Sequence, residues 1–173
     1  MENIYLIGFM GTGKTTVAKA LADKLPYYIC DTDELIVKIC GKSIADIFAN
    51  EGEEYFRAQE TLLLKQLAKE NGLIISCGGG MAVREENVEY MKQGGSVIML
   101  SATAKTVLER AGGDEARPLL KDKKTPEEIE EFMNKRLPYY EGAADFIVDT
   151  DDRDPADIAS EIITWLAMND KLV

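Results

Sequence analysis

Near its N-terminus the chain reads Ile4-Tyr5-Leu6-Ile7-Gly8-Phe9-Met10-Gly11-Thr12-Gly13-Lys14-Thr15-Thr16. From Gly8 onward it fits the pattern of glycine, four residues, glycine, lysine and serine or threonine, whose backbone N–H groups cradle nucleotide phosphates. The run before Gly8 has the apolar character of a buried strand, and apolar residues at helical spacing follow as far as Leu25. A strand, a glycine loop and a helix N-terminus are the parts that such an anion site needs. The segment predicts a nucleotide-binding loop, with an ordinary glycine-rich turn as the alternative.

Two side chains of this loop have the chemistry to act on a nucleotide. Lys14 is expected to reach the β- and γ-phosphates, and the Thr15 hydroxyl is expected to ligate Mg²⁺. The glycines matter because they let N–H groups approach an anion without obstruction by a Cβ atom. We therefore expect a nucleoside triphosphate as ligand and Mg²⁺ as cofactor.

The composition narrows the class of protein. A chain of 173 residues suits one domain, 1–173, and its net charge of −11 argues against nucleic-acid binding because phosphate polyanions would be repelled. No apolar stretch approaches the roughly 18 residues of a membrane span, and the N-terminus lacks the basic region of a signal peptide. We expect a cytoplasmic protein with neither nucleic acid nor membrane as a partner.

Cysteine and histidine usage limits the chemistry. Cys30, Cys40 and Cys77 are odd in number and have no C-x-x-C spacing, so we expect reduced, mostly buried thiols rather than disulfides or a zinc site. The chain contains no histidine, the commonest general base. A proton acceptor must therefore be a carboxylate, a lysine, a tyrosine or the phosphate of the substrate itself.

Short apolar runs alternate with helical patterns along the chain. Strands are expected at residues 4–7, 27–30, 73–77, 97–100 and 146–148. Helices are expected to end just before Gly72 and Gly94, and to begin at the capping box of Thr125 and at Asp154-Pro155. Trp165 in the last helix is expected to pack rather than to react. This alternation predicts a parallel sheet between helices.

Residues 112–124 fit neither pattern. The segment reads Gly112-Gly113-Asp114-Glu115-Ala116-Arg117-Pro118-Leu119-Leu120-Lys121-Asp122-Lys123-Lys124. It is long for a loop in a compact domain, and such loops are usually functional or disordered. We interpret it as a lid, with a merely solvated loop as the alternative.

Two acidic residues follow the second expected strand. Asp31-Thr32-Asp33 stands where ligands bind in open α/β sheets, and in an extended chain its two carboxylates lie on one side. Asp31 is the candidate for the Mg²⁺ shell, and Asp33 is the candidate for holding or deprotonating an acceptor hydroxyl. Taken alone, two solvated acids remain the alternative.

The third expected strand leads into Ser76-Cys77-Gly78-Gly79-Gly80. Three consecutive glycines are an entropic liability unless the backbone must approach something closely. We interpret them as a floor on which the acceptor rests, with Ser76 near the waters of the metal. A plain flexible turn is the alternative.

Three arginines are candidates for binding an anion. Arg57 lies in an acidic helix and would by default pair with Glu60 at the surface. Arg117 falls within 112–124, and Arg136 precedes two tyrosines. By spacing alone, each fits a surface charge better than a ligand-binding group.

These segments occur together in the order typical of shikimate kinases, and the chain resembles that family over nearly its whole length. The segments that carry the resemblance are residues 8–16, Asp31-Thr32-Asp33, Phe56-Arg57 with Glu60, Gly78-Gly79-Gly80, Arg110, Arg117-Pro118-Leu119-Leu120, Arg136 with Tyr139-Tyr140, and Arg153-Asp154-Pro155. They include positions specific to the acceptor, so the resemblance is more specific than a phosphate-binding loop.

The resemblance implies a fold and a reaction. The fold is α/β, a three-layer αβα arrangement with a five-stranded parallel sheet, an acceptor-binding region at about 31–60 and a lid at about 112–124. The reaction is transfer of the γ-phosphoryl group of ATP to the 3-hydroxyl of shikimate, giving shikimate 3-phosphate and ADP in the pathway to chorismate and the aromatic amino acids. We expect a monomer.

The resemblance also implies roles for individual residues. Asp33 would contact the hydroxyls of shikimate and two arginines its carboxylate, the whole acceptor set being Asp33, Arg57, Gly78, Gly79, Gly80 and Arg136. The nucleotide would be bound by Gly11, Thr12, Gly13, Lys14, Thr15, Thr16, Arg110, Arg117, Arg153 and Pro155. The metal would be held by Thr15 and Asp31, and the catalytic residues would be Lys14, Asp33 and Arg117. A guanidinium suits this task because it pairs bidentately with a planar carboxylate.

Two other functions remain open from the sequence. Another small-metabolite kinase of the same fold, for gluconate or a nucleoside monophosphate, would share the phosphate loop. A nucleotide-sensing module without turnover would share it too, although the patterns N-K-x-D and D-x-x-G of GTP switches are missing from the sequence.

Overall fold

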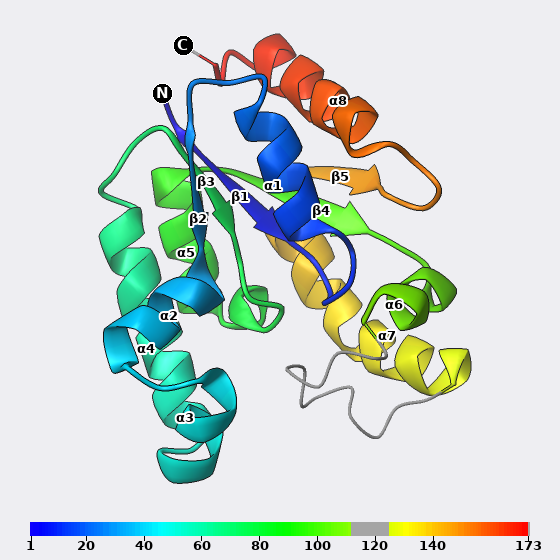
Figure 1. Ribbon diagram of the computed structural model, residues 1–173. Coiled ribbons are helices and arrows are strands. Elements are labelled where there is room, and N and C mark those ends of the chain that lie inside the picture. The colour runs from blue at the N-terminus through cyan, green and yellow to red at the C-terminus, as the bar shows by residue number, and fades with distance from the viewer. Residues whose placement is uncertain (112–124, 173) are drawn as a thin grey trace.

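The computed structural model describes residues 1–111 and 125–172. Within them a five-stranded sheet is entirely parallel and has the strand order β2-β3-β1-β4-β5 (Figure 1). The strands are β1 (Asn3–Ile7), β2 (Tyr28–Asp31), β3 (Leu73–Ser76), β4 (Gly95–Ser101) and β5 (Phe146–Asp149). All five predicted strands and their parallel arrangement are confirmed. The predicted lid, with Arg117, lies outside the described residues.

Helices cover both faces of the sheet. They are α1 (Lys14–Ala22), α2 (Thr32–Cys40), α3 (Ile44–Asn50), α4 (Glu53–Leu67), α5 (Glu85–Gly94), α6 (Ala104–Ala111), α7 (Pro126–Ala143) and α8 (Pro155–Met168), with a short 3₁₀ helix η1 (Met81–Val83). The side chains of strand β1 alternate between the two faces of the sheet, so each face has its own apolar core against one layer of helices. Ile4 and Leu6 pack toward α1 and α8, whereas Tyr5 and Ile7 pack toward α4, α5 and α7. The predicted three-layer fold is confirmed.

Two of the four predicted helix boundaries, those at Thr125 and Asp154, match the structure. Helix α4 already ends at Leu67, so Gly72 lies directly before β3 rather than just beyond a helix. The side chain of Thr125 accepts a hydrogen bond from the Glu128 N–H, and Asp154 caps α8 through the Ala156 N–H. Gly94 was predicted just beyond a helix but is the last residue of α5. Trp165 stacks on Phe146 with ring centroids 5.1 Å apart, so its predicted packing role is confirmed.

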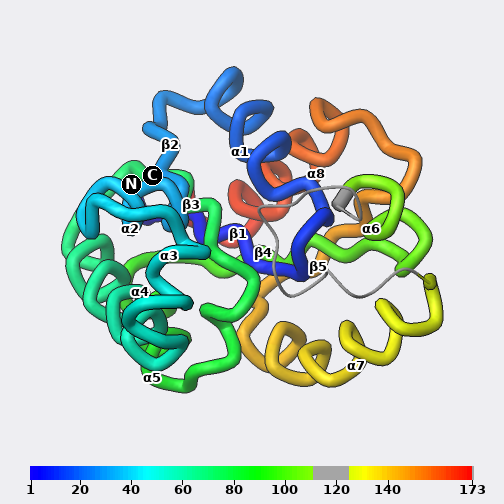
Figure 2. Tube along the Cα trace, turned by 60° about the horizontal axis from the view of Figure 1, so that its bottom comes forward, coloured from blue at the N-terminus to red at the C-terminus, as the bar shows by residue number. Residues whose placement is uncertain are grey.

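Parallel strands bring five chain segments to one edge of the sheet, where each strand ends. Figure 2 looks onto this edge and shows α2, α3 and α4 on one side and α6 and α7 on the other. The central strand β1 lies between β3 and β4. The chain places β2 and β3 on one side of β1 and then crosses to place β4 and β5 on the other side, so the strand order reverses at β1. Ligands of open α/β sheets bind at such a reversal of strand order. The phosphate-binding loop starts there.

Candidate active site

The phosphate-binding loop is held open by its glycines. Gly13 has a left-handed backbone with φ of +95°, and α1 begins directly after it at Lys14. Among the described residues, the N-cap residue Gly13 gives the start of α1 no side-chain hydrogen bond. The backbone donors of a helix N-terminus and the helix dipole favour an anion at this place.

Most of the residues predicted to handle phosphate and metal line one cavity of about 290 Å³. The whole lining, which also includes Asp33, Gly78 and Gly79 of the predicted acceptor set and the buried Cys77, is Gly11, Gly13, Lys14, Thr15, Thr16, Asp31, Asp33, Ser76, Cys77, Gly78, Gly79 and Arg110. The Lys14 Nζ donates to the carbonyl oxygens of Gly8, at 2.8 Å, and Phe9, at 3.0 Å. The structure thus brings residues from three strand ends to one place.

Thr12 differs from its neighbours in the loop. Its side chain is 1% exposed and donates to the carbonyl oxygen of Phe9 at 2.8 Å, so it points inward and stabilises the loop. It does not line the cavity around Lys14 and lines instead a neighbouring cavity that also contains Arg110 and Arg153. Any contact between Thr12 and a phosphate would therefore come from its backbone.

Asp31 and Asp33 line the same cavity for a reason that differs from the one predicted. Strand β2 ends at Asp31, and α2 begins at Thr32, so the two carboxylates are not on one side of an extended chain. Asp31 is the N-cap of α2, and its carboxylate accepts the Glu34 N–H at 3.1 Å. Asp33 lies in the first helical turn, which turns it toward Gly78. The shared placement comes from a strand-to-helix turn.

The glycines after β3 are required by close packing of polar side chains. A Cβ atom at Gly78 would lie 2.9 Å from Asp33 Oδ1 and 3.0 Å from Glu60 Oε2. A Cβ atom at Gly80 would lie 2.3 Å from Arg57 Nη1. The backbone therefore approaches the protein's own acidic and basic groups closely, while the predicted role of these glycines as a floor for the acceptor stays a prediction.

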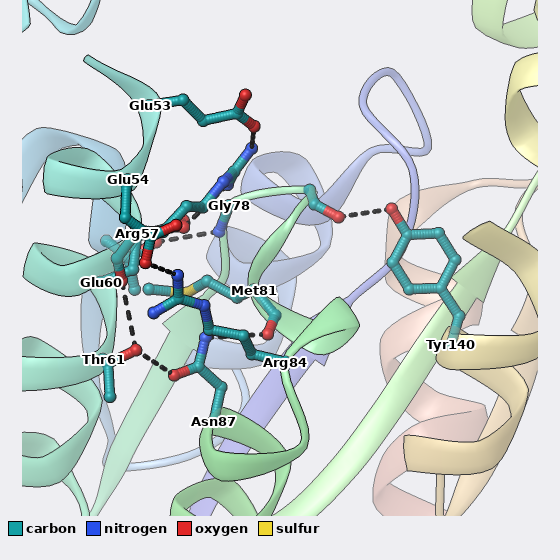
Figure 3. Close-up of polar contacts among 12 residues, drawn as sticks. Glu53, Glu54, Arg57, Glu60, Thr61, Gly78, Met81, Arg84, Asn87 and Tyr140 are labelled. Carbon is teal, nitrogen blue, oxygen red and sulfur yellow. Dashed lines mark hydrogen bonds and ion pairs between the residues drawn. The ribbon is translucent and has the colours of Figure 1, made fainter. Parts of the chain in front are cut away.

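Arg57 and Glu60 form a buried ion pair at this end of the cavity (Figure 3). Arg57 Nη1 lies 2.7 Å from Glu60 Oε1, and Glu60 is 0% exposed. Burial raises the pKa of Glu60 to about 7, against the lowering effect of Arg57, and the nearby Asp33 adds to the rise. The default expectation of a surface pair was wrong in its location, since the pair forms inside the molecule.

Glu60 has no individual role in the sequence interpretation. The signal that could have identified it is its position on α4, four residues after Phe56 and three before Leu63, both of which are buried. A carboxylate on the apolar face of a helix must have a partner, because an unpaired buried charge is costly.

Arg136 reaches the same region from α7. Its Nη1 is buried and has no hydrogen-bond partner among the described residues, and the same holds for Glu60 Oε2. Buried polar atoms normally have partners. An unpartnered guanidinium nitrogen and carboxylate oxygen lie around the glycine loop, where Arg136 Nη1 is 3.3 Å from the Cβ position of Gly79. The guanidinium nitrogen could donate to an anionic group, and the carboxylate oxygen could accept from a hydroxyl.

A second cavity of about 250 Å³ lies beside the phosphate loop. Arg110, Arg153 and Pro155, all predicted at the adenine, line it. The Arg110 guanidinium donates to the Thr150 carbonyl oxygen at 3.3 Å. Arg153 donates to the carbonyl oxygen of Asp149 at 3.0 Å and pairs with a glutamate of α8 at 2.6 Å. These contacts fix two arginines next to Gly13.

Thr150, for which the sequence predicted no role, lines the second cavity. It is 1% exposed, and its hydroxyl lies 2.9 Å from the carbonyl oxygen of Thr12 and 3.1 Å from that of Ser101. One buried side chain thus connects the phosphate loop to the ends of β4 and β5.

Within 1–111 and 125–172, no helix has the length and apolar character of a membrane span.

Comparison with known proteins identifies the family of this chain. Residues 10–167 match the family model described as Shikimate kinase. The shikimate kinase of Persephonella marina is 44% identical over 163 residues, covering 94% of this chain and 98% of that protein. The solved structure of shikimate kinase from Acinetobacter baumannii in complex with shikimate superposes with a TM-score of 0.92 at 34% identity, covering 98% and 94% of the two chains.

A gluconokinase from Sinorhizobium meliloti is also similar in structure, with a TM-score of 0.58 at 15% identity over 97% of this chain and 93% of that one. Identity at this level shows a shared fold alone. The alternative of a gluconate-type kinase is therefore supported only at the level of the fold.

Proposed function

Because the chain belongs to the shikimate kinase family, we propose that the cavity around Lys14 and the cavity beside Arg153 divide that family's reaction between them. The reaction transfers the γ-phosphoryl group of ATP to the 3-hydroxyl of shikimate, in aromatic amino acid biosynthesis. The cavity beside Arg153 and Pro155 would take the adenine. The cavity around Lys14 and Asp33 would take the phosphates and, at its far end, shikimate.

The acceptor end of the cavity is proposed from its unpartnered charges. Arg57 and Arg136 approach the glycine loop from α4 and α7, and the buried Nη1 of Arg136 has no partner in the described part of the chain. Two guanidinium groups suit a planar carboxylate, because each offers two parallel N–H donors. This observation carries the assignment of shikimate's carboxylate to these two arginines, while Asp33 would hold its hydroxyls.

The proposed chemical step is a displacement at phosphorus. The 3-hydroxyl oxygen forms a bond to the γ-phosphorus, the bond from that phosphorus to the β–γ bridging oxygen breaks, and the hydroxyl proton passes to the Asp33 carboxylate. Lys14, now bound to two loop carbonyls, would exchange them for phosphate oxygens and neutralise the charge in transfer. With no histidine in the sequence, Asp33 is the carboxylate best placed to take the proton.

The cavity also suits a hard divalent cation. Thr15, Asp31 and Ser76 offer a hydroxyl, a carboxylate and a second hydroxyl to one space, and Mg²⁺ prefers few protein oxygens together with water and phosphate. Thr15 and Asp31 would hold it. When bound, Mg²⁺ would neutralise phosphate charge.

Several expectations from the sequence stay predictions. They are the single domain 1–173, the monomeric state, the cytoplasmic location and the role of Arg117 within a lid at 112–124. None of them is needed for the assignment of the two cavities.

Measurement of ADP formation with a panel of acceptors tests the function. ADP should form rapidly with shikimate and only at a background rate with gluconate, with a nucleoside monophosphate or with no acceptor. Rapid formation with gluconate would favour the other kinase class. ATP binding without turnover on any acceptor would favour a sensing module.

A further inference from the structure

The loop from Gly78 to Met81 is held at every carbonyl group. The carbonyl oxygen of Gly78 accepts the Met81 N–H at 3.1 Å, and that of Gly80 accepts the Val83 N–H at 3.3 Å. The Met81 carbonyl oxygen accepts the side-chain amide of Asn87 at 3.0 Å (Figure 3). The remaining carbonyl, that of Gly79, accepts the hydroxyl of Tyr140. The loop is therefore an ordered element rather than a flexible turn.

The N–H groups of the same loop have fewer hydrogen-bond partners than its carbonyl groups. Gly78 N–H donates to the buried Thr32 hydroxyl at 2.9 Å. The N–H groups of Gly79 and Gly80 have no acceptor among the described residues. Their Cβ positions lie next to Arg136 and Arg57, respectively. Two adjacent N–H donors between two guanidinium groups are suited to an anionic oxygen.

Tyr140 controls the direction of one of these donors. A trans peptide points its C=O and N–H to opposite sides. Because the Tyr140 hydroxyl holds the Gly79 carbonyl, the Gly80 N–H of the same peptide points away from that hydroxyl, and the Cβ position of Gly80 lies beside the Arg57 guanidinium. Without this bond, the Gly79-Gly80 peptide would keep only the restraints of its neighbours, and glycine offers little intrinsic resistance to rotation.

The same tyrosine holds the loop close to Arg136. Tyr140 is 2% exposed and lies four residues after Arg136 on α7, so the two side chains share one face of the helix. Burial raises the pKa of Tyr140, against the lowering effect of Arg136 and Arg57, which keeps the phenol protonated as a donor. Helix α7 thus supplies a guanidinium group and the hydroxyl that orients the neighbouring peptide.

We infer that Tyr140 is a positioning residue for the acceptor: its hydroxyl fixes the Gly79-Gly80 peptide so that its N–H, beside Arg57 and Arg136, receives the carboxylate of shikimate. The inference rests on the proposed acceptor role of the two arginines. Tyr140 itself does not contact the acceptor, and its effect passes through the peptide group.

The test compares Tyr140→Phe with the matched control Tyr139→Phe, whose ring is 51% exposed on the same helix. Removing the Tyr140 hydroxyl should raise the KM for shikimate by about tenfold, the effect of losing one well-placed hydrogen bond. The KM for ATP and the melting temperature should stay close to those of the wild type. Tyr139→Phe should leave both KM values unchanged.

A spectroscopic measurement separates positioning from a structural role. In the wild-type protein, shikimate should shift the backbone ¹⁵N–¹H resonances of Gly79 and Gly80, and in Tyr140→Phe the Gly80 shift should shrink. An unchanged KM for shikimate, an equal rise in both KM values, or a Tyr140→Phe protein that does not fold would each overturn the inference. If the wild type and Tyr139→Phe both fail to phosphorylate shikimate, the proposed function fails instead.

Discussion

Arg57 Nη1 lies 2.7 Å from Glu60 Oε1, and the carboxylate in this pair is fully buried. A single helical turn of α4 therefore carries both the guanidinium group proposed to bind the acceptor and the group that fixes its direction. The second guanidinium nitrogen of Arg57 lies 3.4 Å from Glu53, an exposed residue at the start of the helix (Figure 3). The contact with the buried Glu60 orients Arg57, whereas the contact with the exposed Glu53 competes with water.

The first prediction concerns pH and stability without substrate. Burial raises the pKa of Glu60 to about 7, above the value of about 4.5 expected when it is unfolded. Between these two values the folded protein binds more protons than the unfolded chain, so the free energy of unfolding must fall as pH rises from 4.5 to 7. The difference is on the order of 3 kcal/mol. Glu60→Gln cannot titrate and should lack this component.

Urea unfolding of both proteins at pH 5, 6, 7 and 8 measures the effect. The wild type should lose stability relative to Glu60→Gln as pH rises through 7, and the relative change should level off by about pH 8. Other carboxylates cancel in the difference. A stability difference between the two proteins that is equal at pH 5 and pH 8 would show that Glu60 titrates normally, in spite of its burial and of Asp33 nearby.

The second prediction concerns the two arginines. Arg57→Lys and Arg136→Lys keep the positive charge but lose the planar pair of donors. Each should raise the KM for shikimate by about tenfold or more, with little change in the KM for ATP. Arg84→Lys is the control, because the Arg84 side chain pairs with the exposed Glu54 rather than with the buried Glu60. If ATP binding weakens instead, these residues have been placed on the wrong ligand.

The third prediction concerns the phosphate loop. Lys14→Met should leave the fold intact and lower the rate of transfer by roughly 10²-fold or more, since a preorganised charge is lost. Lys19→Met, at an exposed position of the same helix, should have the wild-type rate. Circular dichroism would verify that both variants are folded. Normal turnover by Lys14→Met would refute the assignment of this loop.

The fourth prediction concerns the proton. Asp33→Asn keeps the shape of the side chain and removes its basicity, so turnover should fall by roughly 10²- to 10⁴-fold if Asp33 is the general base. The KM for shikimate should change much less, because the amide can still hydrogen-bond a hydroxyl. A loss of only a few fold would mean that Asp33 positions the hydroxyl and that a loose transition state needs little help from a base.

Much of the fold could be predicted because the information is local. Each strand is a short apolar run, and the caps at Thr125 and Asp154 depend on residues no more than three apart. The phosphate loop was predictable for the same reason. Gly94 was misplaced by one residue because the next residue, Gly95, takes the position after the helix.

The acceptor site was less predictable because its geometry depends on packing between distant elements. Glu60 is a surface residue by composition and becomes buried only when α4 packs beneath the loop of Gly78. Thr150 and Tyr140 act through bonds to backbone carbonyls 138 and 61 residues away in sequence. No spacing rule reaches across such separations, and only the family resemblance placed Arg57 and Arg136 at one ligand.

The most direct measurement compares the initial rates of ADP formation with shikimate and with its methyl ester. The ester keeps the 3-hydroxyl and loses the negative carboxylate that the site around Arg57 and Arg136 is proposed to bind. For the wild type, kcat/KM should be lower with the ester by about 10²-fold or more, because charged hydrogen bonds to two guanidinium groups are lost. Equal values of kcat/KM for the two compounds would contradict the assignment of the acceptor site.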